Sequence, residues 1–524
     1  MNEYDYVVVG GGSAGCALAA RLAEDPASRV CLIEAGGAGR SLLIDTPALL
    51  ALTVPRRLHN WAFETEPQSG LAGRRGYQPR GKALGGSSAI NAMIYVRGHP
   101  RDYDDWAAAG NPGWGWRDVL PAFLRAEHNE RGSDDFHATG GPLNVADLRS
   151  PNPVSLAFVE AGVEAGHARN ADFNGATQWG VGLYQVTQRN GRRWSAARAF
   201  VDAAVARGNL VLRTGTHALR LVLEGKACRG VETSRGTVHA RRETIVACGA
   251  FGSPQLLLLS GIGPRHAIEP HGIALRHELP GVGENLQDHP DYVIGYLSSA
   301  PGLIGLTARG LMNLAAGIGA FRREGRGLLA SNVAEAGGFL GTAPGLERPD
   351  LQLHFCIGLV ADHGRDTTPR YGFSCHVCLL RPKSRGRVAL RSADPLAPPL
   401  IDPAFLSEKG DAAQLARGVE LTLQILRQPA LAPFRGRNVF GEDWITGEAL
   451  VDLVRQRADT VYHPAGTCRM GRGEDAVVDA HLRVRGIENL RVADASIMPT
   501  LIGGNANAPA IMIGERCAEF VRSA

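Results

Sequence analysis

The chain has 524 residues, 44% hydrophobic and 21% charged, a composition typical of a folded protein with room for two large cores. Lys and Arg number 56 against 52 Asp and Glu, and the net charge of +4 gives no reason to expect a nucleic-acid partner. The first residues, 1 to 5, are polar and lack the features of a secretory signal, which favours a cytoplasmic location.

The N-terminal region predicts a βαβ unit. Tyr6 to Val9 is a β-branched run, Ala14 to Leu22 has helical character, and Val30 to Ile33 is a second buried strand. Such a unit implies a parallel sheet with a right-handed crossover.

The turn inside this unit carries the G-x-G-x-x-G pattern of dinucleotide-binding folds, as Gly10-Gly11-Gly12-Ser13-Ala14-Gly15. Gly10 permits a tight turn, Gly12 lets the backbone approach a pyrophosphate, and Gly15 allows the helix to pack on the strand. Ser13 and Ala14 open the helix, whose N-terminus attracts phosphate. Glu34, at the end of the second strand, is placed to accept hydrogen bonds from a ribose. The pattern leaves FAD and NAD both open.

The sequence pattern changes near residue 301, after which polar and apolar residues alternate over 351–359, 376–380 and 387–390. The last two runs are joined by Lys383-Ser384-Arg385-Gly386, which predicts a hairpin turn. After residue 445 the pattern returns to a buried strand at 489–492 and a helix at 508–521. We therefore expect a nucleotide domain at 1–300, with substrate-domain insertions around 150–200, a substrate domain at 301–444, and a return to the first domain at 445–524.

Two further segments bear on metals and membranes. Cys375 and Cys378 form a C-x-x-C without a second pair or a histidine cluster at zinc spacing, so we predict a strand and no metal site. No uninterrupted run of roughly 18 apolar residues predicts a spanning helix, and the nearest approach, residues 303–321, is broken by Arg309 and Asn313. The stretch fits a helix over the substrate domain better than a weak contact with the inner face of a membrane, because it has few basic residues.

The resemblance to a known family rests on two longer motifs. Gly81-Lys82-Ala83-Leu84-Gly85-Gly86-Ser87-Ser88-Ala89-Ile90-Asn91 resembles the first signature of the glucose-methanol-choline (GMC) oxidoreductases, and residues 249–263, GAFGSPQLLLLSGIG, resemble the second. Within that family the chain is most similar to the choline dehydrogenase and aliphatic alcohol dehydrogenase branch. The resemblance implies a discontinuous, α/β, Rossmann-like FAD-binding domain with an α+β substrate domain built on a mostly antiparallel sheet.

FAD is the cofactor that this resemblance implies. Gly85, Gly86 and the small Ser87 would let backbone amides press against a flat ring. By motif, Asn91 and Met93 are expected to contact the flavin, and Asp494 and Ala495 to lie near its ribityl chain. Some members attach the flavin through a histidine at the position of Ile90, so noncovalent binding is expected here.

The resemblance also implies a catalytic pair, His463 and Asn505. His463 lies in Tyr462-His463-Pro464-Ala465-Gly466-Thr467, which resembles the family's catalytic histidine motif, and a histidine can hold a proton near neutral pH. Asn505 stands where members carry a second histidine or an asparagine, and its amide can hold the substrate oxygen. We expect Asn507 instead to cap the last helix, because it precedes Ala508-Pro509.

Glu335 and Tyr462 are candidates for substrate binding, and an exposed loop carboxylate is an equally good interpretation of Glu335. The expected reaction is oxidation of a primary alcohol to an aldehyde by hydride transfer to flavin N5, with electrons passed to a quinone or other acceptor. An oxygen-using oxidase and a non-redox hydroxynitrile lyase that binds FAD are the alternatives.

Overall fold

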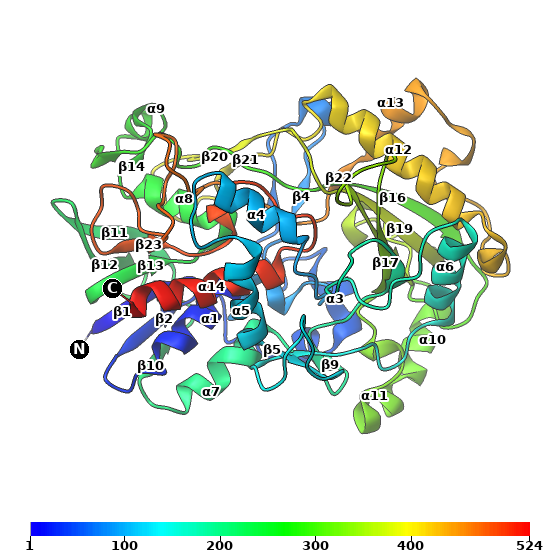
Figure 1. The fold of residues 1–524 in the computed structure, drawn as a ribbon, viewed down its shortest axis with the longest axis horizontal. Coiled ribbons are helices and arrows are strands. Elements are labelled where there is room, and N and C mark those ends of the chain that lie inside the picture. Colours follow the sequence, from blue (N-terminus) through cyan, green and yellow to red (C-terminus); the bar gives the residue numbers. More distant parts are fainter. Residues whose placement is uncertain (1, 524) are drawn as a thin grey trace.

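Two β-sheets organise the protein, whose computed structural model describes residues 2–523 (Figure 1). The first sheet has seven strands in the order β10-β2-β1-β13-β12-β11, with β23 also paired to β13. Its strands are β1 (Glu3–Val9), β2 (Val30–Ile33), β10 (Leu210–Arg213), β11 (Ala218–Glu224), β12 (Ala227–Thr233), β13 (Val238–Val246) and β23 (Leu490–Val492). The pairs between β10, β2, β1, β13 and β23 are parallel, which confirms the predicted crossover unit.

The last helix returns to this first sheet. Helix α14 (Asn507–Arg522) packs on α1 (Ser13–Leu22) and α5 (Trp116–Ala126), and Figure 1 shows it beside α1. Glu515 of α14 is fully buried and pairs with Arg21 of α1 at 2.9 Å and Arg125 of α5 at 2.8 Å. The C-terminal helix α14 is therefore tied by an ion pair to α1, the helix that follows the dinucleotide turn.

The second sheet is antiparallel throughout, with the order β22-β16-β19-β18-β17-β7. Its strands are β7 (Gly180–Leu183), β16 (Pro290–Leu297), β17 (Ala334–Leu340), β18 (Leu351–Cys356), β19 (Gly372–Leu379) and β22 (Asp459–Thr460). Helices α6 (Pro153–Glu164), α12 (Lys409–Leu426) and α13 (Glu448–Arg457) contact the sheet and bury an apolar core against it. The predicted fold class, a Rossmann-like domain with a mostly antiparallel second domain, is confirmed.

The membership of the second sheet differs from the predicted domain limits. Strand β16 begins at Pro290, before the expected start at 301, and β22 lies after the expected end at 444. Sheet pairing unites strands that are far apart in the chain, which local patterns do not show.

The predicted hairpin at 383–386 is wrong. Strand β20 (Arg387–Ala389) pairs with β21 (Leu400–Asp402), and β19 pairs with β16 and β18 instead. The backbone amides of Lys383 and Ser384 donate to the buried carboxylate of Asp411, at the start of α12. The carboxylate of Asp411, from another element, thus accepts the hydrogen bonds that these amides would have made within a hairpin.

The apolar stretch 303–321 forms two short helices, α10 (Ala308–Ala316) and α11 (Ile318–Glu324). No helix within residues 2–523 combines the length and apolar composition needed to cross a bilayer. On α10, Leu311 and Met312 are 57% and 64% exposed, whereas Leu314 packs against a small buried apolar cluster that includes Phe321 and Leu329.

Candidate active site

The dinucleotide turn has a backbone that only glycine can form. Gly10 has φ of +108°, and a Cβ on it would overlap the Ala247 carbonyl group. A Cβ on Gly15 would overlap the Gly10 carbonyl oxygen. Gly12 is the N-cap residue of α1, so the positive end of that helix faces the cavity beside the turn.

The second glycine loop, residues 81–91, packs directly on the first. Gly85 N donates to Gly11 O at 2.7 Å. Gly86 has φ of +53°, and a Cβ on it would lie 2.6 Å from the Gly12 Cα. The two loops therefore form one continuous backbone surface, although more than 60 residues separate them in the chain.

A cavity of about 1420 Å³ runs from this surface into the second sheet domain. It is larger than the roughly 300–1,000 Å³ of a pocket for a drug-sized ligand, and it has room for a dinucleotide. Most of the predicted cofactor residues line it, namely Gly10, Gly12, Ser13, Ala14, Glu34, Gly86, Ser87, Asn91, Met93, Asp494 and Ala495. Gly15 and Gly85 stand behind the lining, where they allow close backbone packing.

Glu34 lies at the end of β2 with its carboxylate in the cavity lining. It accepts hydrogen bonds from Gly11 N at 3.0 Å and Gly36 N at 2.7 Å. Burial raises the pKa of Glu34 to about 7, although the hydrogen bonds from the two amides oppose this effect and lower the pKa. The carboxylate is thus anchored to the dinucleotide turn through Gly11 and to the loop after β2 through Gly36, and it keeps lone pairs for a ribose hydroxyl.

Asp494 joins the C-terminal segment to the start of α8 (Gly249–Leu259). Its Oδ2 accepts from Gly249 N at 2.8 Å and from Ser253 Oγ at 2.5 Å. Its Oδ1 accepts from Ser496 N at 2.8 Å. These bonds fix the backbone of Ala495 at the cavity wall, close to the second predicted signature.

Asn91 and Met93 are held by an arginine that the sequence motifs did not reveal. Asn91 Oδ1 accepts from Met93 N at 3.0 Å and from Arg193 Nη1 at 2.9 Å. Arg193 is buried and also donates to the carbonyl groups of Ile44 and Ser88. Burial lowers the pKa of Arg193 to about 9. This one guanidinium therefore fixes the end of the loop that carries the flavin-contacting candidates.

The two predicted catalytic residues meet at the far end of the cavity. His463 Nε2 lies 3.2 Å from Asn505 Nδ2, and both residues line the cavity. His463 N donates to Asp288 Oδ1 at 2.8 Å, and His463 Nδ1 lies 3.0 Å from His289 Nδ1. Burial and the neighbouring histidines lower the pKa of His463 well below its usual value, so its imidazole is neutral and able to accept a proton.

Motif reading missed four polar residues around this pair: Asp288, His289, Gln352 and His354. Gln352 Nε2 donates to Asn505 Oδ1 at 2.8 Å, and His354 Nε2 lies 3.4 Å from Asn505 Nδ2. Burial lowers the pKa of His289 and of His354 to about 3. The only sequence signal was an unusual density of polar residues at two places: Gln287 to His289, just before strand β16, and Gln352 and His354, within the otherwise apolar strand β18.

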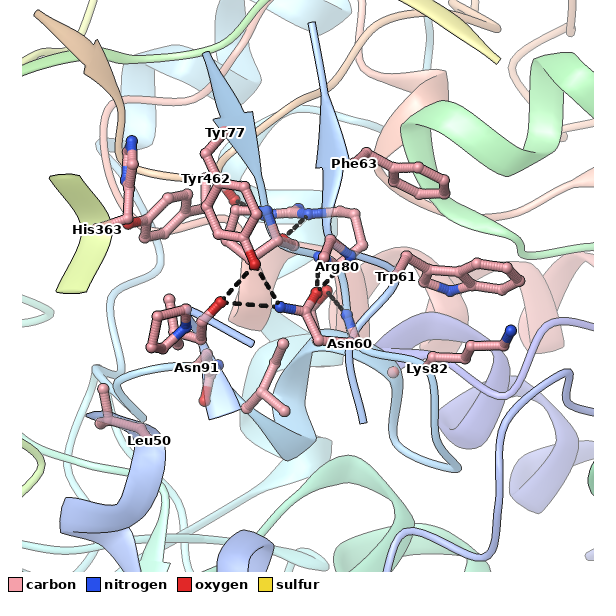
Figure 2. Close-up of a pocket in the computed structure, with 18 of the residues that line it drawn as sticks. Leu50, Asn60, Trp61, Phe63, Tyr77, Arg80, Lys82, Asn91, His363 and Tyr462 are labelled. Atoms are coloured by element: carbon pink, nitrogen blue, oxygen red, sulfur yellow. Dashed lines mark hydrogen bonds between the residues drawn. The ribbon is translucent and has the colours of Figure 1, made fainter. Parts of the chain in front are cut away.

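Aromatic side chains line the cavity in two groups: Tyr462 lies with Tyr77 and His363, and Trp61 stacks on Phe63 (Figure 2). The Tyr462 hydroxyl lies 2.5 Å from His363 Nδ1, and the Tyr462 carbonyl accepts from Arg80 at 2.6 Å. Protein cations cover two of the rings: Lys82 Nζ lies 4.1 Å from the Trp61 centroid and Arg365 lies 4.5 Å from that of Tyr77.

Glu335 does not reach the cavity, which corrects both interpretations of it. It lies on β17, only 1% exposed, and its Oε2 accepts from Asn152 N at 2.7 Å and Ser155 Oγ at 2.8 Å. Its Oε1 accepts from Ser331 Oγ at 2.6 Å. Strand alternation turns this side chain toward the start of α6, while the neighbouring Ala334 lines the cavity. Glu335 is a buried structural carboxylate.

Asn507 does not cap the last helix. Ala506 is the N-cap of α14 and makes no side-chain capping bond, whereas Asn507 is the first helical residue. Asn507 Oδ1 accepts from Ser13 Oγ at 2.7 Å, and both residues line the cavity. The asparagine therefore links α14 to the dinucleotide turn.

Comparison with known proteins places this arrangement among flavoenzymes. A family model described as GMC oxidoreductase matches residues 4–291, and a second model of that description matches residues 382–514. The chain is 46% identical to an alcohol dehydrogenase (acceptor) of Pseudomonas putida over 99% of this chain and 95% of that protein. It is 43% identical to the mitochondrial choline dehydrogenase of Homo sapiens over 99% of this chain and 90% of that protein.

Solved structures agree with this placement. Pyridoxine 4-oxidase from Mesorbium loti superposes with a TM-score of 0.89 at 34% identity, covering 99% of both chains. A formate oxidase superposes with a TM-score of 0.91 at 26% identity, covering all of this chain and 98% of that one.

The position of Glu335 yields a first prediction. We expect Glu335→Ala to lower the thermal unfolding midpoint, because Asn152 N and two serine hydroxyls lose their buried acceptor, at a cost of about 1–3 kcal/mol for an unsatisfied group. The midpoint is measured by circular dichroism. Glu64→Ala, at an exposed carboxylate, is the control and should leave the midpoint unchanged. An unchanged midpoint in Glu335→Ala would contradict the structural role.

Proposed function

The chain belongs to the GMC oxidoreductase family, as its two motifs indicated, and we propose that it oxidises a primary alcohol to an aldehyde with FAD as its cofactor. The observation that carries this proposal is the contact of His463 with Asn505 in the same cavity as the dinucleotide turn. When bound, FAD supplies the acceptor for the hydride that leaves the alcohol carbon.

The cavity residues fit FAD. The start of α1 and the Gly10 to Gly15 turn would hold the pyrophosphate, Glu34 the ribose, and the loop from Gly85 to Met93 the ring. The backbone surface shared by the two glycine loops supports this assignment. Because no side chain projects from these glycines, a flat ring can lie close to their backbone amides.

The catalytic pair would handle the hydroxyl group of the substrate. His463 Nε2 takes the hydroxyl proton, and Asn505 Nδ2 donates to the same oxygen and holds it in place. The neutral state of the buried imidazole supports the role of His463 as base, since a protonated ring cannot accept a proton.

Apolar residues next to the pair favour a neutral substrate. Leu50, Val333, Ala334, Cys356 and Val461 belong to one apolar cluster and also line the cavity. Of the acidic cavity residues outside the cofactor end, Glu64 and Asp366 are each paired with an arginine. An uncharged aliphatic or benzylic primary alcohol suits these surroundings.

We propose a quinone or a similar carrier as the acceptor of the electrons. The relative at 46% identity is named an acceptor-dependent dehydrogenase, which supports this choice over oxygen. An oxidase is the second candidate, because both solved structures described above are named oxidases and a relative at 43% identity is named an oxygen-dependent choline dehydrogenase. A lyase that does not use its flavin is the third.

A weak membrane contact would bring an apolar acceptor to the cavity. Leu306 and Leu311 are 47% and 57% exposed and also line the cavity, so apolar surface surrounds part of its opening. In Figure 1, α10 and α11 project from the body of the protein. Arg309 of α10 and Arg322 and Arg323 of α11 are exposed. The last two lie just beyond the apolar stretch 303–321, which itself has only one basic residue, and add the positive charge that anionic headgroups attract.

Flavin reduction tests the catalytic pair. We expect His463→Ala to slow anaerobic flavin reduction by a primary alcohol roughly 10²-fold or more, the usual effect of a positioned base. Asn505→Ala should slow it too. Stopped-flow absorbance of the flavin measures the rate. Full-speed reduction in His463→Ala would overturn the assignment, and bleaching by no alcohol at all would favour the lyase.

Asn507→Ala is the matched control for Asn505→Ala. Because Asn507 binds Ser13 at the cofactor end of the cavity, we expect this variant to hold FAD more weakly and to reduce the FAD that it retains at nearly the wild-type rate. The opposite pattern would exchange the roles of the two asparagines.

Acid precipitation tests how FAD is held. Ile90, at the position of the attachment histidine, lines the cavity and has no nucleophilic atom, so we propose noncovalent binding. Noncovalent contacts exist only in the folded chain, and the yellow colour should therefore remain in the supernatant. Colour that stays in a washed pellet would show a covalent bond through another residue.

Choline should be a poorer substrate than neutral alcohols. Lys82 and Arg365 already cover the faces of Trp61 and Tyr77, so a quaternary ammonium would meet like charge where cation–π contacts could form. Initial rates with choline, 1-hexanol and benzyl alcohol measure the preference. A higher kcat/KM for choline than for both neutral alcohols would contradict it.

Vesicle flotation tests the membrane contact. The protein should float with vesicles of phosphatidylcholine and phosphatidylglycerol, and less with phosphatidylcholine alone, because the arginines need anionic headgroups. Leu311→Asp combined with Met312→Asp should abolish flotation, whereas Leu156→Asp, at an exposed leucine of α6, should not. Equal flotation of all variants would contradict contact through α10.

A further inference from the structure

We infer that Tyr184 and Gln352 are positioning residues that fix the tautomer of His463 through the amide of Asn505. This inference rests on the proposed function, in which His463 accepts the hydroxyl proton. A neutral imidazole has two tautomers, and only the one with an unprotonated Nε2 presents a lone pair to Asn505 and the cavity.

The direction of the hydrogen bonds starts from a backbone carbonyl. The buried hydroxyl of Tyr184 lies 2.6 Å from Leu353 O. A carbonyl oxygen only accepts, so the single hydroxyl proton of Tyr184 is donated to it. The Tyr184 oxygen is left as an acceptor for its second neighbour.

That second neighbour is the side-chain amide of Gln352, on β18 and fully buried. Gln352 Nε2 lies 3.2 Å from the Tyr184 oxygen, where only an N–H donor fits. The other hydrogen of the same nitrogen is donated to Asn505 Oδ1 at 2.8 Å. The carbonyl side of the Asn505 amide is thereby fixed toward Gln352.

The Asn505 nitrogen must therefore point at the histidines. Nδ2 lies 3.2 Å from His463 Nε2 and 3.4 Å from His354 Nε2, and an amide nitrogen only donates. The Nε2 atoms of His463 and His354 therefore both accept, and the proton of the neutral His463 ring is on Nδ1. That proton is donated to His289 Nδ1 at 3.0 Å, which must accept in turn.

One chain of bonds thus runs from Leu353 O to the Nδ1 proton of His463, and every member has a single allowed direction. If the Gln352 amide turned over, its oxygen would face the accepting Tyr184 oxygen. If the Asn505 amide turned over, its nitrogen would face the donating nitrogen of Gln352. The fold therefore holds His463 in the form that can take a proton before any substrate arrives.

Nitrogen NMR of the flavin-loaded protein tests the inference without turnover. With histidine labelled by ¹⁵N in the ring, and His463 assigned by its loss in His463→Ala, the wild type should show a pyrrole-type Nδ1 and a pyridine-type Nε2. Gln352→Met, which keeps the shape but removes the donor, should give a mixture of both tautomers. A wild-type His463 protonated on Nε2 would overturn the inference.

A double-mutant cycle provides the kinetic test. Gln352→Met should slow flavin reduction by about tenfold or more, with little change in the apparent substrate Kd. Gln352→Met combined with Asn505→Ala should be no slower than Asn505→Ala alone, because both act through one amide. Gln68→Met, at a buried glutamine that donates to Glu66 O and Asp402 and does not line the cavity, should leave the rate unchanged.

The outcomes separate this inference from the proposed function. Full-speed reduction in Asn505→Ala would contradict the role of Asn505 itself. A slow Asn505→Ala with a fast Gln352→Met, or with fully additive effects, would overturn only the positioning role. If Gln352→Met fails to fold, Tyr184→Phe interrupts the same chain one bond earlier, and the same NMR mixture is expected from it.

Discussion

Gly86 lies so close to Gly12 that a Cβ atom on it would stand 2.6 Å from the Gly12 Cα, and the rest of the site depends on this approach. Because the two loops touch through backbone alone, they form one surface beside the N-terminus of α1. The cavity begins at that surface and ends at His463. Arg193 fixes the far end of the second loop, and Asn507 ties the last helix to the first loop.

At the end of the cavity that holds His463, the chemistry depends on the burial of three histidines. His289, His354 and His463 lie together in the interior, and burial lowers the pKa of each, so all three are neutral. Neutral rings have both a donor and an acceptor nitrogen, and hydrogen-bond direction then becomes the property that the fold must set. The amides of Gln352 and Asn505 set it without introducing charge.

The cavity wall shows how cations of the protein itself can limit a substrate class. Trp61 and Tyr77 offer aromatic faces, which alone would suit a quaternary ammonium. Lys82 and Arg365 occupy those faces, and the surface next to His463 is apolar. The chain shares 43% identity with a choline dehydrogenase, yet these two features are the grounds on which we propose a neutral alcohol as its substrate.

The sequence by itself determined the features that depend on neighbours in the chain. The βαβ unit, the positive φ of Gly10, the position of Glu34 after β2 and the motif around His463 were readable because each arises within a few residues. Glu335, Asn507 and the segment 383–386 were misread for the opposite reason. Their partners, Ser155, Ser13 and Asp411, are brought to them only by tertiary packing. Which polar group meets which is decided by how strands and helices far apart in the chain are stacked, and no local pattern carries that information.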